Sequence, residues 1–369
     1  MTLSPLFRPM AYDALPGWGD DDPSHAFAAF RRSAFQAQVK PYKTGLLGLA
    51  FDAFQPAYAE ARTVETLAVN DARDFFERRF VPALIAPGYP EQAGLKKAGF
   101  VTGFYEPEVE ASAVRTPRFN VPVYSRPADL VDVDDANRPK TMDPCLAFAR
   151  QTAHGLVEYH ERSAIDGGVL EGLGLEIAWL ADKVDLFFVQ VQGAAKLRMV
   201  DGAAKRITYA AKSGQRFTAI GSELVDMGEL QLHDVTMQSI RAWLKANPAR
   251  VDELLWRNRS YVFFRETEIG NPDLGPVAAA KVQLTAGRSV AVDRSLHTFG
   301  TPFYVNAPQL KAFGGKPFQR LMIAQDTGSA IVGPARGDLF AGSGDAAGEI
   351  AGVVRAAASF YALVPRALL

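Results

Sequence analysis

Residues 324–331 read AQDTGSAI, and residues 337–348 read GDLFAGSGDAAG. In each stretch an aspartate, Asp326 or Asp338, stands where an apolar run meets glycine. Glycine lets a ligand approach the backbone closely, and a carboxylate at a strand end can be held partly out of water. A third aspartate, Asp293, follows the apolar run 290–292. Three such aspartates indicate a β module with a carboxylate site, although Asp beside glycine also forms Asx-turns that have no chemical role.

Outward from these stretches, short apolar runs punctuated by glycine and proline predict strands over much of the chain. The expected strands are residues 100–105, 121–124, 186–191, 261–265, 289–292, 301–305, 321–325 and 331–333. The first 80 residues differ, because their apolar side chains recur at helical spacing after Asp22, the expected helix cap. Thr236 caps another expected helix. The order helix, β, helix, β predicts a mainly β protein with helices, built from two β modules.

Composition narrows the function classes. The chain has 369 residues, enough for about two domains. Its 40 basic and 41 acidic residues leave a net charge of −1, which argues against nucleic acid as the main partner. The single cysteine, Cys145, excludes an intrachain disulfide and a cysteine-rich zinc site. No apolar run reaches the roughly 18 residues of a membrane helix, and the N-terminus shows no signal-peptide pattern.

Several catalytic patterns are missing or incomplete. Residues 326–328 are the Asp-Thr-Gly of aspartic proteases, but that chemistry needs two such aspartates and the chain has one copy. No Gly-x-Ser-x-Gly elbow occurs. The histidines do not have the spacing of a zinc helix motif; they are His25, His154, His160, His233 and His297. We therefore expect neither a metal nor an organic cofactor.

Aromatic residues beside polar ones suggest a sugar-binding surface, because aromatic faces pack on sugar C–H groups while amides and arginine bind hydroxyls. The aromatic candidates are Phe104, Tyr105, Phe187, Phe188, Phe263, Phe264 and Phe340. Their polar neighbours are Gln190, Gln192 and Arg265. The alternative is that strand aromatics form the core.

Eight segments, in order along the chain, carry a family resemblance. They are residues 102–107, 188–193, 237–241, 260–266, 291–293, 324–331, 337–340 and 342–348. Together they resemble the lytic murein transglycosylase A family, whose C-terminal part is the three-aspartate ("3D") domain. The resemblance implies a double-psi β-barrel domain and a second β-barrel domain inserted into it, with the glycan strand in a groove between them.

The resemblance also implies domain boundaries. Residues 1–108 would supply the helical N-terminal part and first strand of the main domain, 109–232 the inserted barrel, and 233–369 the rest of the main domain. The sequence pattern changes from helical to strand-like near residue 99, and a helix is expected again near Thr236. Both changes fit this layout.

By resemblance, the activity is that of a peptidoglycan lytic transglycosylase. Such an enzyme cleaves the β-1,4 bond between N-acetylmuramic acid and N-acetylglucosamine and forms 1,6-anhydromuramic acid. The family pattern places the acid/base at Asp338, with Asp326 as the alternative acid and Asp293 as the third aspartate. Substrate-binding candidates are Thr102, Phe104, Tyr105, Gln190, Gln192, Arg265, Phe340 and Gly342.

The implied partner is the glycan strand of peptidoglycan, and the implied location is the periplasm or outer membrane. We expect a monomer, with peripheral membrane association through a lipid anchor that this chain does not carry. Two other activities stay open. One is a hydrolase on the same glycan that uses two carboxylates. The other is a glycan-binding module without catalysis.

Overall fold

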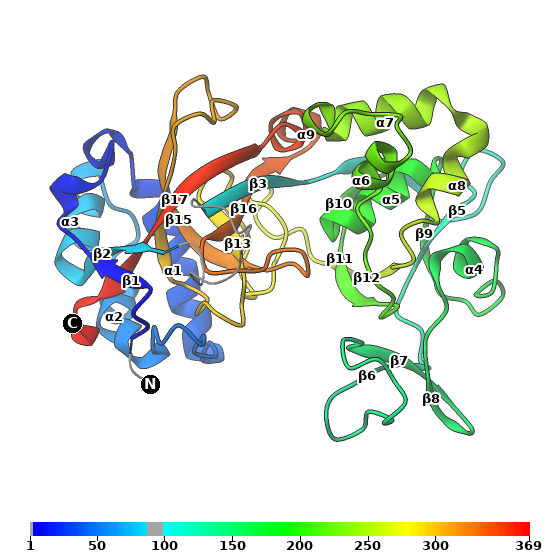
Figure 1. The fold of residues 1–369 in the computed structure, drawn as a ribbon, viewed down its shortest axis with the longest axis horizontal. Coiled ribbons are helices and arrows are strands. Elements are labelled where there is room, and N and C mark those ends of the chain that lie inside the picture. Colours follow the sequence, from blue (N-terminus) through cyan, green and yellow to red (C-terminus); the bar gives the residue numbers. More distant parts are fainter. Residues whose placement is uncertain (1–2, 87–98) are drawn as a thin grey trace. The chain divides into compact units, whose positions relative to one another are not determined.

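The computed structural model describes residues 3–86 and 99–369 and divides the chain into two compact units (Figure 1). Unit 1 combines Met1–Tyr105 with Gly270–Leu369, and unit 2 is Glu106–Ile269. An insertion is therefore present, but it runs to residue 269 rather than ending at 232.

The later boundary follows from pairing inside unit 2. Strand β12 (Val262–Thr267) pairs antiparallel with β11 (Ala204–Lys212). Helices α7 (Met237–Ala246) and α8 (Val251–Leu255) bury Trp243 and Leu254 in one cluster with residues of α5 (Lys183–Gln192) and α6 (Ile220–Asp226). The helix expected at Thr236 is confirmed, since its hydroxyl accepts the Ser239 N–H at 3.0 Å. It opens the last part of unit 2 and not the return to unit 1.

In unit 1, eight described strands form one sheet in the order β1-β2-β17-β14-β15-β13-β16-β3, and β17 also pairs with β3. Their bounds are Phe7–Pro9 (β1), Phe80–Ile85 (β2), Arg355–Pro365 (β17), Pro302–Ala307 (β14), Phe318–Asp326 (β15), Ser289–Val292 (β13), Arg336–Ser343 (β16) and Gly99–Glu106 (β3). The extra pairing joins the strands from β17 to β3 into a ring, and closure leaves those strands without an unpaired edge.

The ring has a packed inner face and an outer face that carries polar groups. Val290 and Leu339 are cross-strand partners, fully buried on the inner face. Gly337 also faces inward, where a Cβ would lie 2.8 Å from the Phe360 ring and 3.0 Å from Val290. Because side chains alternate along a strand, the next residue, Asp338, points to the outer face. Because Gly337 has no side chain, Phe360 and Val290 can pack against the backbone next to Asp338.

Four α-helices of the described residues belong to unit 1: α1 (Ser24–Val39), α2 (Gln55–Thr63), α3 (Val69–Arg79) and α9 (Asp345–Gly352). The first three meet in an aromatic cluster in which the Phe30 ring lies 5.0 Å from Tyr58 and 5.8 Å from Phe75. The expected cap is close to the observed start of α1, since the carboxylate of Asp22 accepts the Ser24 N–H at 3.0 Å. Gln325 ties β15 to α1 through the Ala29 carbonyl at 2.8 Å.

Unit 2 has a six-stranded and a three-stranded sheet among its described residues. The larger sheet has the order β12-β11-β10-β4-β9-β5, and the smaller one β6-β7-β8. The strands not yet bounded are Ala194–Met199 (β10), Glu108–Ser112 (β4), Glu176–Leu180 (β9), Val121–Tyr124 (β5), Leu130–Asp132 (β6), Phe148–Thr152 (β7) and Gly155–Val157 (β8). An isolated bridge between Ser125 and Phe264 joins the ends of the larger sheet. A short helix, α4 (Arg162–Asp166), completes the unit.

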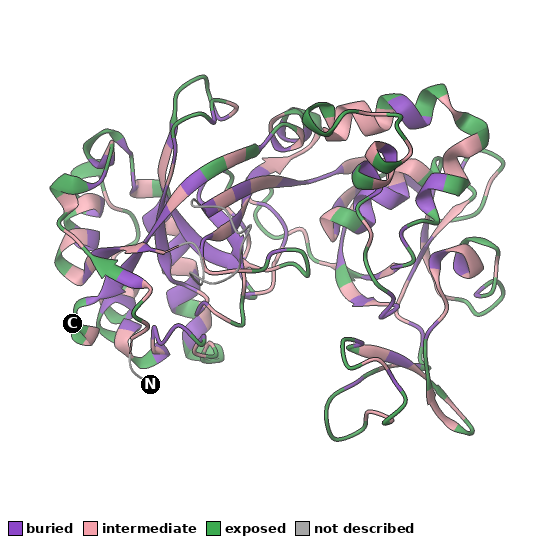
Figure 2. Ribbon diagram, viewed as in Figure 1, coloured by how far each residue is buried: buried purple, intermediate pink, exposed green. Residues whose placement is uncertain are grey.

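Two strand predictions are wrong. Residues 186–191 lie in helix α5, which Asp182 caps at its start and Gly193, in the left-handed region with φ 78°, ends. Residues 331–333 lie in the irregular segment between β15 and β16. Figure 2 shows the eight-stranded sheet of unit 1 largely buried, whereas the three-stranded sheet of unit 2 is mostly intermediate or exposed and α7 keeps an exposed side. No helix in the described ranges has the length and hydrophobicity needed to cross a membrane.

Candidate active site

The register of unit 1 brings two of the three aspartates to one row. Ala291 of β13 is the antiparallel partner of Asp338 and the parallel partner of Asp326. The two aspartates therefore flank Ala291 on its two neighbouring strands, and the register with β15 shifts between Val290 and Ala291. With strands about 4.8 Å apart, their Cα atoms lie on the order of 10 Å from each other. The strands β15, β13 and β16 can be followed side by side in Figure 1.

Asp338 is held by the neighbouring strand. The Thr102 hydroxyl of β3 donates a hydrogen bond to Asp338 Oδ1, and Arg336 Nη2 donates to the Thr102 hydroxyl oxygen at 2.7 Å. Arginine can only donate, so the hydroxyl proton is directed to Asp338. The Oδ1 atom is thereby an acceptor, and a proton on this carboxyl group belongs on Oδ2. The Arg336 guanidinium also lies 5.5 Å from the centre of the Phe100 ring, which fixes its position.

The surroundings raise the pKa of both carboxyl groups. Burial raises the pKa of Asp338, and the Thr102 hydrogen bond and the Arg336 charge offset this only in part. Burial also raises the pKa of Asp326 to about 6, against hydrogen bonds from the backbone N–H groups of Thr327 and Ala279, with a further rise from the charge of Asp338. The Ala279 bond is 3.2 Å long. Both groups can therefore hold a proton at higher pH than an ordinary aspartate.

Asp293 lies outside this row and organises a turn. Its carboxylate accepts the Ser295 N–H at 3.0 Å and the Gly333 N–H at 2.9 Å. Burial raises the pKa of Asp293, but the hydrogen bonds from Ser295 and Gly333 outweigh it and the net shift is downward. Nearby, His297 Nε2 lies 2.9 Å from the Pro334 carbonyl oxygen. These contacts hold the segment that connects β15 to β16, and so connects Asp326 to Asp338.

The comparisons with known proteins agree with this layout. The family model described as "MltA specific insert domain" matches residues 100–265, and the model "3D domain" matches residues 288–364. A crystal structure of a membrane-bound lytic murein transglycosylase from Agrobacterium tumefaciens is 50% identical, with a TM-score of 0.91 and 98% of each chain covered. The chain belongs to the lytic murein transglycosylase A family.

Other members of the family are more distant. A crystal structure of MltA from Neisseria gonorrhoeae is 31% identical, with a TM-score of 0.78, and covers 97% of this chain and 92% of that one. The membrane-bound lytic murein transglycosylase A of Escherichia coli strain K12 is 33% identical over 257 residues. That match spans 68% of this chain and 61% of the E. coli protein.

The remaining substrate-binding candidates of unit 1 are buried or half-buried. The rings of Phe104 and Phe340 lie 5.2 Å apart and pack with Ala291 and Leu284 in one buried cluster. Tyr105 is also buried, and a Cβ at Gly348 would lie 3.0 Å from its ring. Gly342 is half-buried near the end of β16. Phe104 and Phe340 follow Thr102 and Asp338 by two positions on their strands, so these two aromatic candidates share the face of Asp338.

The substrate-binding candidates of unit 2 differ in burial. Gln190 is buried, accepts a hydrogen bond from Arg162 Nη1 at 2.7 Å and donates to the Val262 carbonyl at 3.3 Å. Gln192 is half-buried and Arg265 is exposed. The four further aromatic residues of unit 2 are buried core, as the alternative interpretation expects; they are Phe187, Phe188, Phe263 and Phe264.

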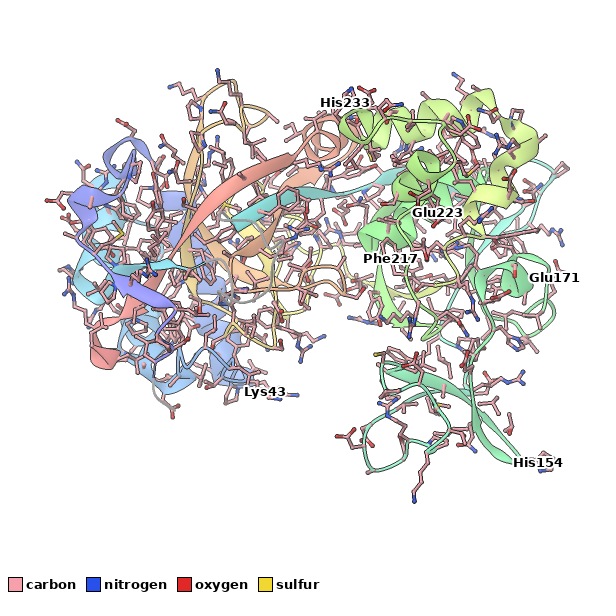
Figure 3. The ribbon with its side chains drawn as sticks, in the orientation of Figure 1. Lys43, His154, Glu171, Phe217, Glu223 and His233 are labelled. Carbon is pink, nitrogen blue, oxygen red and sulfur yellow. The ribbon has the colours of Figure 1, made fainter. Side chains whose placement is uncertain are left out.

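The residues that sequence reasoning missed are Arg336 and the backbone N–H of Ala279. The first had a usable signal, because Arg336 stands two residues before Asp338 and side chains two apart on a strand share a face. The second had none, since only the fold brings Ala279 to Asp326. The histidines remain dispersed: His154 and His233 lie far apart in Figure 3. Within the described residues, no group of three His, Cys, Asp or Glu side chains is placed to hold a metal ion.

Proposed function

We propose that this protein is a peptidoglycan lytic transglycosylase with Asp338 as its single acid/base, acting at the cell envelope. It would cleave the β-1,4 bond between N-acetylmuramic acid and N-acetylglucosamine without adding water. The observation that carries the assignment is the setting of Asp338: a half-buried carboxyl group with a raised pKa, held through one oxygen by Thr102. The names of its relatives support the reaction class.

The first step needs a proton at the glycosidic oxygen. Asp338 can supply it because burial raises its pKa and because Oδ2 is the oxygen that Thr102 leaves available. As the proton transfers, the bond between C1 of the muramic sugar and the leaving oxygen breaks. The sugar then carries positive charge, as an oxocarbenium-like species. The new carboxylate is stabilised by the Thr102 hydroxyl, which Arg336 keeps oriented.

The second step closes the ring. The Asp338 carboxylate takes the proton of the 6-hydroxyl group of the same sugar, and O6 forms the new bond to C1. The acid is regenerated, and the product ends in 1,6-anhydromuramic acid. Because the nucleophile belongs to the substrate, its effective concentration is high, and no second carboxylate is needed to activate water.

Asp326 has a distinct place in this scheme. Two backbone N–H groups bind its carboxylate, and its strand is separated from that of Asp338 only by β13. The charge of Asp338 raises the pKa of Asp326, so ionisation of Asp338 favours the protonated form of Asp326. We therefore assign Asp338, which Thr102 and Arg336 orient, as the acid, and Asp326 as a neighbour whose protonation depends on it.

The test is digestion of purified peptidoglycan sacculi, with the released muropeptides analysed by mass spectrometry. Anhydro products, one water lighter than hydrolysis products, are the expected result. Products with reducing ends would replace the proposal with a hydrolase that uses Asp326 and Asp338 together. Binding to sacculi without release would indicate a glycan-binding module. The matched control is Asp338→Asn, which changes no side-chain volume and removes the acid.

A further inference from the structure

His297 is a buried histidine that the reaction described above does not use. Its Nε2 atom lies 2.9 Å from the Pro334 carbonyl oxygen, and because a carbonyl oxygen only accepts, Nε2 carries a proton in this contact. The ring packs edge-on against Phe303 of β14, with ring centres 5.0 Å apart. Burial lowers the pKa of His297 to about 4, and the Pro334 contact and the charge of Asp293 offset this only in part. At neutral pH the ring is therefore uncharged, and its one N–H faces the carbonyl.

The Pro334 carbonyl belongs to a short segment, residues 333–335, that is anchored on both sides. The Gly333 N–H donates to Asp293 Oδ2 at 2.9 Å, and Asp293 lies with His297 in the segment that follows β13. The Ala335 carbonyl accepts a backbone N–H of β3 at 2.9 Å. Strands β13 and β3 are the two neighbours of β16 in the ring. Both neighbours therefore fix the point at which β16 begins.

The start of β16 decides how the acid is held. Its first residue, Arg336, donates to the Thr102 hydroxyl oxygen at 2.7 Å, and that hydroxyl donates to Asp338. Arg336 and Asp338 are two residues apart on one strand, so a shift of its beginning moves both of them relative to Thr102 on β3. Hydrogen bonds weaken steeply when distance and angle depart from their optimum. The orientation of Asp338 therefore depends on the position of residues 333–335.

We propose that His297 is a positioning residue, which fixes the start of β16 by donating a hydrogen bond to the Pro334 carbonyl. Through this contact it keeps Arg336 beside Thr102 and the Thr102 hydroxyl directed at Asp338. This inference rests on the proposed function and adds to it a residue that acts only through others. A neutral histidine suits this role, because its donor stays in place while Asp338 gains and loses its proton.

The experiment measures kcat, KM and the pKa of Asp338 in variants of His297. His297→Leu removes the donor and keeps a side chain of similar size, whereas His297→Gln keeps an N–H as many bonds from Cα as Nε2. We expect His297→Leu to lower kcat on purified glycan strands about tenfold and to change KM less than about twofold, because a slight displacement of the acid affects the chemical step. Weakening of the Thr102 hydrogen bond should also raise the pKa of Asp338, measured by NMR titration of its 13C-labelled carboxyl group. His297→Gln should restore both values.

A double-mutant cycle with Thr102→Val separates positioning from general damage. If His297 acts through Thr102, the double variant His297→Leu, Thr102→Val should have the kcat of Thr102→Val alone, whereas independent losses would multiply. Tyr304→Phe is the matched control. It removes another buried hydrogen bond of unit 1, from Tyr304 Oη to the Pro16 carbonyl at 2.7 Å, and it lies outside residues 333–338. This control should lower Tm and leave kcat unchanged.

Three results would overturn the proposal: multiplied losses in the double variant, a folded His297→Gln protein as slow as His297→Leu, or an equal fall of kcat in Tyr304→Phe. If the leucine variant does not fold, His297→Asn takes its place, because its amide is one bond too short to reach the Pro334 carbonyl. Wild-type enzyme that releases no anhydro product would refute the proposed function instead. The NMR titration still tests the positioning in that case, and an unchanged pKa of Asp338 in His297→Leu would contradict it.

Discussion

In unit 2, Glu106 and Arg206 are both fully buried, and their side chains bind each other at two points. Arg206 Nε lies 2.7 Å from Glu106 Oε1, and Nη2 donates to Oε2 at 3.0 Å. In unit 1, Asp338 has a cation nearby, Arg336, but that guanidinium binds Thr102 and not the carboxylate. Glu106 is paired directly with Arg206, whereas Asp338 is connected to Arg336 only through the Thr102 hydroxyl.

The direct pair suits a structural acid, whereas the indirect contact suits an acid that must exchange a proton. A bidentate partner stabilises the ionised carboxylate in every step, which suits a group that fixes two chain segments together. Arg206 also donates to the Ile269 carbonyl, so it contacts the first and the last residue of unit 2. Arg336 contacts Asp338 only through the Thr102 hydroxyl, so burial has the larger effect on the pKa of Asp338. This carboxyl group can then both hold and release a proton.

The largest expected effect comes from removing the acidic proton of Asp338. Asp338→Asn keeps the size and hydrogen-bonding shape of the side chain but has no acidic proton. We expect release of anhydromuropeptides from sacculi to fall by about 10³-fold, the range for loss of a general acid and base. The measurement is the initial rate of product release by mass spectrometry, with circular dichroism to verify folding. Asp293→Asn should lose much less activity, and the reverse order would exchange the two roles.

Breaking the pair in unit 2 should instead affect folding. Glu106→Gln leaves the Arg206 charge buried without its carboxylate, which costs about 3–5 kcal/mol. Urea unfolding followed by native-state hydrogen exchange of residues 106–269 measures this. Lys205→Ala is the control, because it breaks the exposed Lys205–Glu266 ion pair and should cost less than about 1 kcal/mol. A Glu106→Gln protein as stable as the wild type would show that the buried pair does not hold the unit together.

Sequence reasoning succeeded where one local pattern decided the structure. Strand β13 has the predicted bounds 289–292, and the Thr236 cap is the start of α7. It failed at residues 186–191, where a short apolar run suits a buried strand or a buried helix equally well. Asp182 and Gly193, the two ends of α5, carried the deciding signal. The later boundary of the insertion was out of reach, because it depends on which strand β12 joins.

For the aspartates, too, the local pattern predicted only part of the arrangement. Position next to glycine singled out Asp293, Asp326 and Asp338 as one group, but only the register about Ala291 separates the pair from the third. The hydrogen bond from Thr102 crosses 236 positions of sequence, which no local pattern contains. Gln190 looked like a surface amide beside aromatic residues, yet it is buried against Arg162.

A smaller change tests the relay that distinguishes the two acids. Thr102→Val removes the hydroxyl between Arg336 and Asp338, and loss of a hydrogen bond to a charged group should lower kcat about 10- to 100-fold. That hydrogen bond lowers the pKa of Asp338, so its loss should raise the pKa further. Activity requires the protonated acid, and its alkaline limb should therefore move to higher pH. Thr102→Ser should restore both kcat and the limb. A lower kcat with an unmoved limb would contradict the relay.

The smallest effect should come from Asp326→Asn, measured as stability. Burial raises the pKa of Asp326 from an ordinary value near 3.8 to about 6, so the folded protein binds a proton more tightly than the unfolded chain. Wild-type stability should then fall as pH rises through that interval, and the asparagine variant should not share this fall. The two proteins should melt together near pH 4, whereas above pH 7 the variant should be about 1–2 kcal/mol more stable, a gain of a few degrees in Tm. Asp345→Asn, at an exposed position with the same change in charge, supplies the control. A Tm difference that stays constant from pH 4 to pH 8 would mean that Asp326 carries no burial penalty and that only Asp338 differs from the paired acid of unit 2.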